Sequence, residues 1–161
     1  MKVFGGVVIL VLGYLLLWPV PIAPISWQAP SSSGFSGEFA ENNRLAGLSF
    51  IELGEDKGPE DFAINAAGTI ATATHSGAVL LRKKGEATFT PWINTGGRPL
   101  GIEFDTNGNL LIADAHRGLL IAVPDGELTV LVNQVENTNV VYADDVDVAG
   151  NGNIYFTDAT T

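Results

Sequence analysis

The sequence has no cysteine and few basic residues, and each absence excludes classes of protein. Because none of its 161 residues is Cys, a disulfide scaffold, a thiolate zinc site and a cysteine nucleophile are all excluded. Eight Lys and Arg stand against eighteen Asp and Glu, which gives a formal net charge of -10. A chain of this charge would repel a phosphate backbone, so no nucleic acid is expected as a partner.

Beyond residue 37 the sequence also lacks any run with the apolar period of an α-helix. Disorder does not explain this, because 46 % of the residues are hydrophobic. The chain instead shows short β-rich runs separated by turns that contain some of its 19 glycines. These features predict an all-β domain, and the length suits about one domain.

The first 27 residues differ from the rest, because Val3 to Val20 carry no charge. As a helix this run would span roughly 27 Å, and Lys2 is the only base beside it. We therefore expect residues 1–27 to form a single transmembrane helix, with the remainder on the extracytoplasmic side. The alternative is a signal segment that is cleaved to leave a secreted or periplasmic protein. Residues 28–37 are small and polar, which predicts a flexible tether.

The sequence from residue 38 to 161 repeats itself. When the repeats are aligned, Gly68, Gly108 and Gly152 coincide at spacings of 40 and 44 residues. Each unit predicts a β-hairpin, and the first two units add a third and a fourth strand. Four antiparallel strands in about 40 residues are typical of a β-propeller blade. About two and a half blades are present, and since closed propellers have about four to eight, we expect an N-terminal fragment of a longer protein.

Acidic pairs occur at the start of the first strand in the first and third units. The aligned positions are Glu60, Leu100 and Asp144, followed by Asp61, Gly101 and Asp145. Because the first strand of each blade lines the central channel, the four carboxylates are expected to converge, and they then need a cation unless one of them stays protonated. Ca²⁺ suits them because it accepts about six to eight oxygen ligands in irregular geometry. The structural alternative is that these acids only bond to nearby backbone amides.

Three segments carry a resemblance to a known family: GPEDFAIN from Gly58, GRPLGIEFDTNGNLLIADAHRGLL from Gly97, and DDVDVAGNGNIYFTDAT from Asp144. They resemble the strictosidine synthase-like branch of the six-bladed propellers. This branch includes adipocyte plasma-membrane-associated protein and is related to the gluconolactonase, regucalcin and paraoxonase families. The resemblance implies a six-bladed β-propeller, and its animal membrane-associated members have an N-terminal anchor before the propeller.

The resemblance also implies roles for the acidic residues. In the calcium-dependent relatives a glutamate at the position of Glu60 binds the channel metal, and an asparagine usually stands where this chain has Asp144. The residues that match Asp61 and Asp145 contribute to a second calcium in paraoxonases. The metal ligands expected here are thus Glu60, Asp144, Asp61 and Asp145, with the other ligands outside the sequence.

The function expected from these observations is calcium-dependent hydrolysis of a small ester or lactone, with no catalytic residue identified. Two alternatives stay open. One is a strictosidine synthase-like C–N condensing enzyme or lyase without a metal. The other is a propeller that binds a small molecule or a protein without turnover, which Leu100 favours because paraoxonases carry a channel histidine there.

The remaining polar candidates are expected to be structural. His75 and His116 both follow a second strand and are expected at corners rather than in a nucleophile pair. Asp114 and Asp158 end their second strands, which favours a hydrogen bond at the blade corner. The run Asp105–Gly108 lacks the EF-hand spacing and is expected to be a turn.

Overall fold

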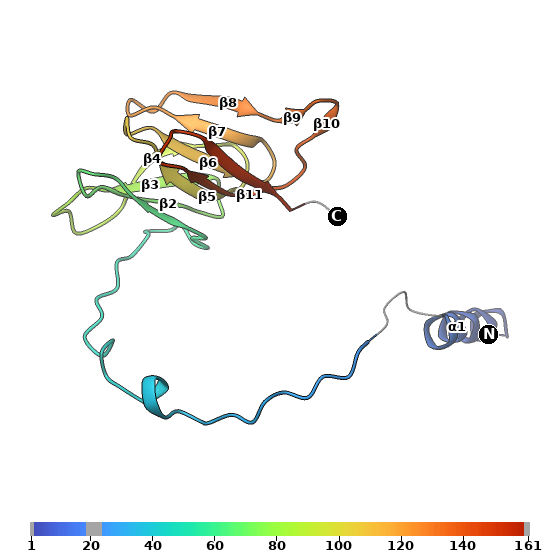
Figure 1. Ribbon diagram of the computed structural model, residues 1–161. Helices are drawn as coiled ribbons and strands as arrows, with labels where there is room; N and C mark the ends of the chain where they lie inside the picture. The colour runs from blue at the N-terminus through green and yellow to red at the C-terminus, as the bar shows by residue number, and fades with distance from the viewer. Residues whose placement is uncertain (1, 19–23, 160–161) are drawn as a thin grey trace. The chain divides into compact units, whose positions relative to one another are not determined.

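The computed structural model describes residues 2–18 and 24–159 and has two compact parts, residues 1–47 and 48–161 (Figure 1). The first part contains helix α1 (Lys2–Leu17) and a 3-10 turn, η1 (Gly37–Phe39), and includes the expected tether. Helix α1 covers most of the apolar run that the sequence shows, while residues 19 and 20 of that run lie outside the described residues. Among the helices that the structure describes, none has the length and hydropathy needed to cross a membrane.

The second part consists of antiparallel sheets that follow the sequence repeat. Their strands are β1 (Phe62–Ile64), β2 (Ile70–Ala73), β3 (Ala78–Arg82) and β4 (Thr90–Asn94) in the first sheet; β5 (Pro99–Phe104), β6 (Leu110–Asp114), β7 (Gly118–Ala122) and β8 (Leu128–Val132) in the second; and β11 (Ala143–Val148) and β12 (Ile154–Asp158) in the third. The predicted four-strand units are confirmed, although β4 begins at Thr90 rather than at Ala87.

A glycine with a left-handed backbone conformation lies in the first turn of each sheet. Gly68, Gly108 and Gly152 have φ of 78°, 83° and 85°, a left-handed conformation that glycine adopts without steric cost. In the second sheet Asp105 accepts hydrogen bonds from the amides of Asn107 and Asn109, both at 2.8 Å. Burial would raise the pKa of Asp105, but the hydrogen bonds from Asn109 and Asn107 outweigh it and lower the pKa. The expected turn at Asp105–Gly108 is present.

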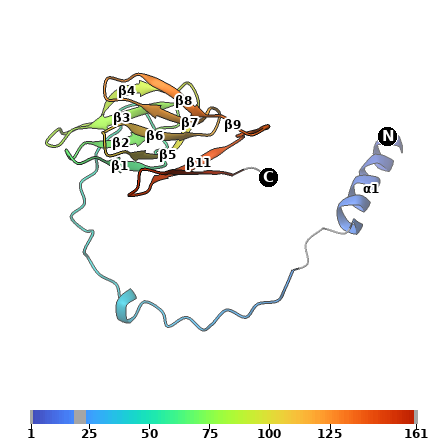
Figure 2. The ribbon, with the colours of Figure 1, turned by 45° about the horizontal axis from the view of Figure 1, so that its top comes forward.

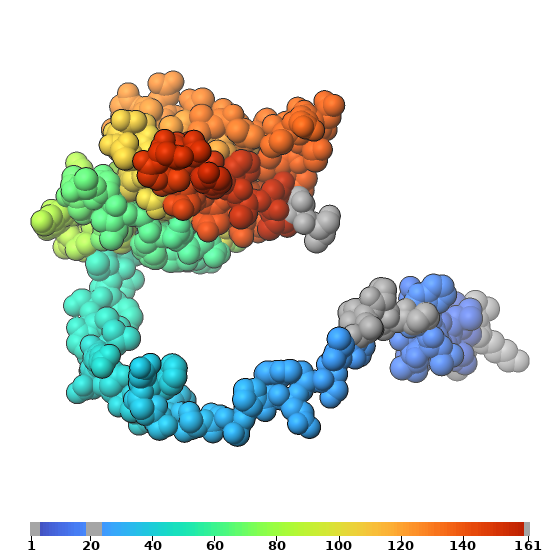
Figure 3. All heavy atoms as spheres, in the orientation of Figure 1, coloured from blue at the N-terminus to red at the C-terminus, as the bar shows by residue number. Residues whose placement is uncertain are grey.

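Apolar side chains are buried between successive sheets rather than within any one of them. One cluster joins the first and second sheets and includes Val79, Ile102 and Leu120. Another joins the second and third sheets and includes Leu111 and Val146. Figure 2 shows β1, β5 and β11 side by side, and Figure 3 shows the red C-terminal residues packed against the yellow and orange residues of the second sheet. Each sheet therefore depends on its neighbours for its core, as propeller blades do.

A short hairpin that the repeat did not predict connects the second and third sheets. It consists of β9 (Gln134–Val135) and β10 (Thr138–Asn139). Glu136 at its tip has φ of 54°, a conformation uncommon for a residue with a side chain. Each of its strands has only two residues, and all four are exposed. A segment this short has no alternation of apolar and polar residues from which a strand could be predicted.

Candidate site at the start of the inner strands

The inner strands β5 and β11 both begin with an irregular register. The pairing shifts between Pro99 and Ile102 in β5, and between Ala143 and Val146 in β11. Such a bulge leaves a backbone amide without its usual partner across the sheet. These amides need an acceptor from a side chain, and the aligned acidic residues lie next to them.

Aspartates supply the acceptors in all three sheets. Asp61 Oδ1 accepts from the amide of Phe62 at 2.7 Å, and Asp145 Oδ1 accepts from the amide of Val146 at 2.9 Å. The second sheet has Gly101 at this position, so it has no carboxylate of its own. There Asp61 Oδ2 reaches across from the first sheet and accepts from the amide of Ile102 at 2.9 Å. One carboxylate thus connects two sheets.

The missing side chain at Gly101 also lets the third sheet approach closely. A Cβ at Gly101 would lie 2.5 Å from Asp145 Oδ1, 2.6 Å from Asp145 Cα and 3.0 Å from the carbonyl oxygen of Asp144. Real Cβ atoms do not approach other atoms so closely. Glycine at this position therefore brings Asp144 and Asp145 beside the start of β5.

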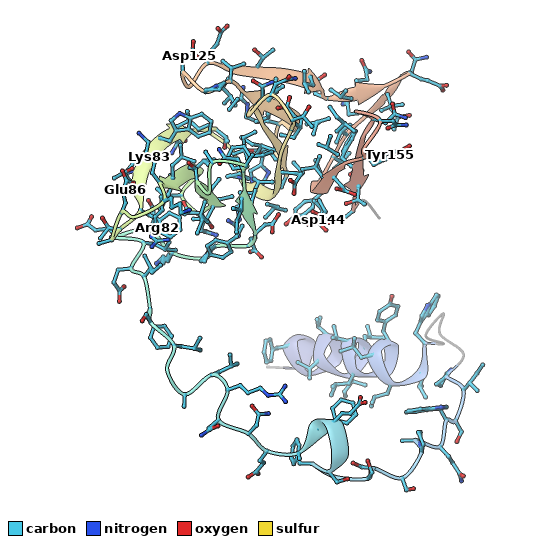
Figure 4. The ribbon with its side chains drawn as sticks, turned by 60° about the vertical axis from the view of Figure 1, so that its left-hand side comes forward. Arg82, Lys83, Glu86, Asp125, Asp144 and Tyr155 are labelled. Atoms are coloured by element: carbon cyan, nitrogen blue, oxygen red, sulfur yellow. The ribbon has the colours of Figure 1, made fainter. Side chains whose placement is uncertain are left out.

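Glu60 and Asp144 differ in what surrounds them. Glu60 Oε1 lies 2.6 Å from Nη2 of Arg98, which comes from the neighbouring sheet, and their side chains are 53 % and 15 % exposed. Asp144 is exposed, and the hydrogen bonds to Thr157 and Val146 at this place in the third sheet are made by its neighbour Asp145. Figure 4 shows Asp144 on the third sheet, well separated from the turn that contains Lys83 and Glu86.

All four predicted acidic residues line one hollow of about 310 Å³, which we call the acidic hollow. Its lining consists of Glu60, Asp61, Leu100, Gly101, Asp144 and Asp145. In the described part of the chain, however, no three acidic or histidine side chains are grouped closely enough to hold a metal ion. Both oxygens of Asp61 and one oxygen of Asp145 accept from amides, and one oxygen of Glu60 is paired with Arg98.

Further carboxylates fix the corners of the sheets. Asp114 is fully buried, and its Oδ1 accepts from the amides of Arg98 at 3.0 Å and His116 at 2.9 Å. Asp158 accepts from the amides of Val141 and Tyr142. Both residues therefore have the structural role expected from the sequence.

In the first sheet Thr74 occupies the corner position, and sequence reasoning missed the residue that supplies the carboxylate there. Asp56 Oδ1 accepts from Ser76 Oγ at 2.5 Å and from Thr74 Oγ1 at 3.2 Å. The available signal was the threonine at position 74, where the aligned units have Asp114 and Asp158. It indicated that another residue must complete this corner.

Neither histidine lines the acidic hollow. His75 is exposed at the corner of the first sheet, where its amide donates to the carbonyl of Lys57 at 2.9 Å. His116 lines a separate hollow together with Arg117 and residues of the β9–β10 hairpin. Both histidines are thus at corners, as expected.

Glu103, which the sequence did not single out, adds negative charge between the second and third sheets. Burial raises the pKa of Glu103, and the charges of Asp147 and Asp61 raise it further against the opposing effect of the Phe104 amide. The folded chain therefore holds this proton more tightly than the unfolded chain does. Glu103 should lower stability as the pH rises from the ordinary pKa of glutamate through its raised value.

Glu103→Gln should remove this pH dependence and raise the midpoint of thermal unfolding at neutral pH, because a neutral amide does not repel Asp147 and Asp61. Melting curves between pH 4 and pH 7 check the expectation. A variant whose midpoint follows the same pH dependence as the parent would show that Glu103 titrates normally.

Several known proteins are similar to this chain in sequence. The family model described as "Strictosidine synthase-like, N-terminal" matches residues 37–81. Protein STRICTOSIDINE SYNTHASE-LIKE 7 of Arabidopsis thaliana is 38 % identical over 122 residues, which cover 72 % of this chain and 33 % of that protein. Adipocyte plasma membrane-associated protein of Gallus gallus is 31 % identical over 163 residues, which cover 91 % and 39 %. The chain therefore spans about a third of the length of these curated relatives.

Solved structures support the all-β, propeller-like part of the expected fold. A gluconolactonase from Xanthomonas campestris matches with a TM-score of 0.56 at 23 % identity, covering 62 % of this chain and 34 % of that one. Virginiamycin B lyase from Staphylococcus aureus matches with a TM-score of 0.54 at 15 % identity, covering 65 % and 36 %. At these identities the match shows a propeller-like arrangement of sheets alone.

Proposed function

Because this chain is similar to the strictosidine synthase-like proteins and folds into propeller-like sheets, we propose that it forms the channel mouth of an enzyme that hydrolyses a small ester or lactone. The observation that carries the proposal is the acidic hollow, where carboxylates from separate sheets lie around the start of β5.

Calcium is the cofactor that we propose for this hollow. The oxygens of Glu60 and Asp144 fit the preference of Ca²⁺ for carboxylate ligands, and the two residues would hold the ion from different sheets. Bound calcium would supply positive charge that polarises a substrate carbonyl. Asp61 and Asp145 would keep the strand starts in place through their amide hydrogen bonds. Asp144, which is exposed, would also be able to orient a water molecule.

A second candidate function is a metal-free C–N condensation or lyase reaction. It is favoured by the absence of a three-residue metal cluster in the described chain. A hollow with four carboxylates around it also suits the ammonium group of an amine substrate. A propeller that binds its ligand without turnover would share the same hollow.

We also propose that the N-terminal segment associates with a membrane. Helix α1 has exposed apolar side chains along its length, including Phe4, Leu10 and Leu17, and relatives bear the name plasma membrane-associated protein. Sedimentation with lipid vesicles is expected for the full chain and not for a chain that lacks residues 1–27. Equal sedimentation of the two would contradict this proposal.

The hydrolase proposal is tested by aryl-ester and lactone hydrolysis with and without calcium. Glu60→Gln should lower the calcium-dependent rate about tenfold, because a neutral amide oxygen is a weaker ligand than a carboxylate. Glu127→Gln is the matched control, since Glu127 is exposed at the turn between β7 and β8. Equal rates in chelator and in calcium would dismiss the metal. No hydrolysis by the parent, together with amine condensation, would favour the second candidate.

A further inference from the structure

A second hollow, of about 470 Å³, lies where the corner between β6 and β7 meets the β9–β10 hairpin. Because Pro99 of β5 pairs with Asp114 of β6, this corner lies at the same edge of the second sheet as the start of β5. Figure 1 shows the hairpin extending from the end of β8. We call this space the corner hollow. Its lining includes His116 and Arg117 from the corner, and Val130, Asn133, Gln134 and Asn139 from β8 and the hairpin segment.

Glycine at position 118 lets the two walls of the corner hollow approach each other. Gly118 has φ of 85°, and a Cβ there would collide with the carbonyl oxygen of Val132 at the end of β8. On the opposite wall Gln134 and Asn139 are directly paired across the hairpin, so their side chains lie on the same face of it. Backbone packing and strand pairing therefore set the shape of the hollow.

Arg117 is held by both its backbone and its side chain. Its amide donates to the carbonyl of Asp114 at 3.1 Å, and its Nη1 donates to the carbonyl of Thr95, a buried residue that follows β4. A guanidinium has several N–H donors, and the bond to Thr95 uses one of them. Arg117 is half-buried, so it presents a positive charge in a fixed position at the hollow.

None of the described residues that line the corner hollow carries a carboxylate, although the chain has eighteen Asp and Glu. The lining consists of a guanidinium, an imidazole, three side-chain amides and two valines. The acid of the hairpin, Glu136, has the left-handed conformation at its tip and is not part of the lining. Guanidinium, imidazole and amide groups all carry N–H donors. Hydrogen-bond donors and positive charge are thus gathered here in a chain whose net charge is -10.

We propose that the corner hollow binds the carboxylate group of a small organic acid. The planar guanidinium of Arg117 matches a carboxylate, with which it can form parallel N–H···O bonds. The amides of Asn133, Gln134 and Asn139 both donate and accept, so they suit hydroxyl groups elsewhere on the ligand. The volume lies in the range of about 300–1,000 Å³ that is typical of small-molecule sites. The site is separate from the acidic hollow, so this inference does not depend on calcium.

Titration of the full chain with sodium gluconate, followed by NMR of the ligand, tests the proposal. Gluconate combines a carboxylate with several hydroxyl groups, and D-glucose is its uncharged counterpart. Glucose should bind about tenfold more weakly, and Arg117→Gln should weaken gluconate binding about tenfold, because each loses a charge-assisted hydrogen bond. Gln134→Ala should weaken it about threefold through the loss of a neutral hydrogen bond. Because Gln134 is exposed, this variant tests the hollow even if Arg117→Gln fails to fold.

Lys83→Gln is the matched control for the loss of charge. It removes one positive charge from the exposed turn that follows β3, and it should leave the affinity for gluconate unchanged. Circular dichroism and thermal unfolding establish that each variant is folded.

The proposal is overturned if the folded parent does not bind gluconate, or if the folded Arg117 and Gln134 variants bind it as tightly as the parent does. Equal binding of glucose and gluconate would show that the hollow does not recognise the carboxylate. Tighter binding of inorganic phosphate than of gluconate would assign a different anion and contradict the carboxylate. Equal losses in Arg117→Gln and Lys83→Gln would show an effect of net charge alone. Each of these results leaves the proposed hydrolase function to its own test.

Discussion

Gly101→Ala should lower the free energy of unfolding by about 3 kcal/mol, at the upper end of the range for overpacked sites. The added Cβ would lie 2.6 Å from Asp145 Cα, so the collision is with backbone and a change of rotamer cannot relieve it. The third sheet would have to move away from the second, which would also displace Asp144 from the acidic hollow. Urea unfolding followed by circular dichroism measures the loss.

Gly150→Ala is the matched control for this substitution. A Cβ at Gly150, in the turn between β11 and β12, would meet nothing within 4 Å. Both variants add the same methyl group at a glycine, one where two sheets meet and one in an open turn, so the difference between them isolates the contact between sheets. Equal unfolding midpoints for the two variants would mean that the sheets do not meet at Gly101 as described.

Asp114→Ala should also destabilise the chain by about 3 kcal/mol, since hydrogen bonds to charged groups contribute about 1.5–3 kcal/mol each. Its Oδ1 accepts hydrogen bonds from the backbone amides of Arg98 and His116, and the side chain is fully buried. Without the carboxylate both amides lose their acceptor. The same urea unfolding experiment applies.

Asp114→Asn distinguishes the hydrogen bonds from the charge. Its amide oxygen can still accept at the position of Oδ1, and its NH₂ group would replace Oδ2, which has no partner among the described residues. We expect it to lose much less stability than Asp114→Ala. If the asparagine variant is as unstable as the alanine variant, the negative charge rather than the acceptor holds this corner.

Gly97 explains why the corner at Asp114 is so closely packed. A Cβ on Gly97 would lie 2.6 Å from Asp114 Oδ2 and would also collide with Oδ1. The glycine therefore lets the chain pass directly over the carboxylate on its way into β5. The same carboxylate accepts a hydrogen bond from the amide of Arg98, and the side chain of Arg98 pairs with Glu60 in the lining of the acidic hollow.

The repeat made much of the fold predictable from the residues alone. Alternating apolar residues, together with a glycine that can adopt a left-handed turn, determine each hairpin locally, and these features recur around Gly68, Gly108 and Gly152. Equivalent positions in equivalent sheets point the same way, so aligned acids such as Glu60 and Asp144 could be expected at one hollow. Their role as metal ligands stays a prediction.

Only the tertiary structure decided how the sheets share their polar groups. Asp61 serves the amide of Ile102 because Gly101 offers no carboxylate, Arg98 pairs with Glu60 across two sheets, and Asp56 completes a corner that Thr74 leaves open. These contacts join residues up to 41 positions apart. A sequence period specifies conformation within each sheet, whereas which donor meets which acceptor between sheets depends on their packing offset and on the bulges in β5 and β11.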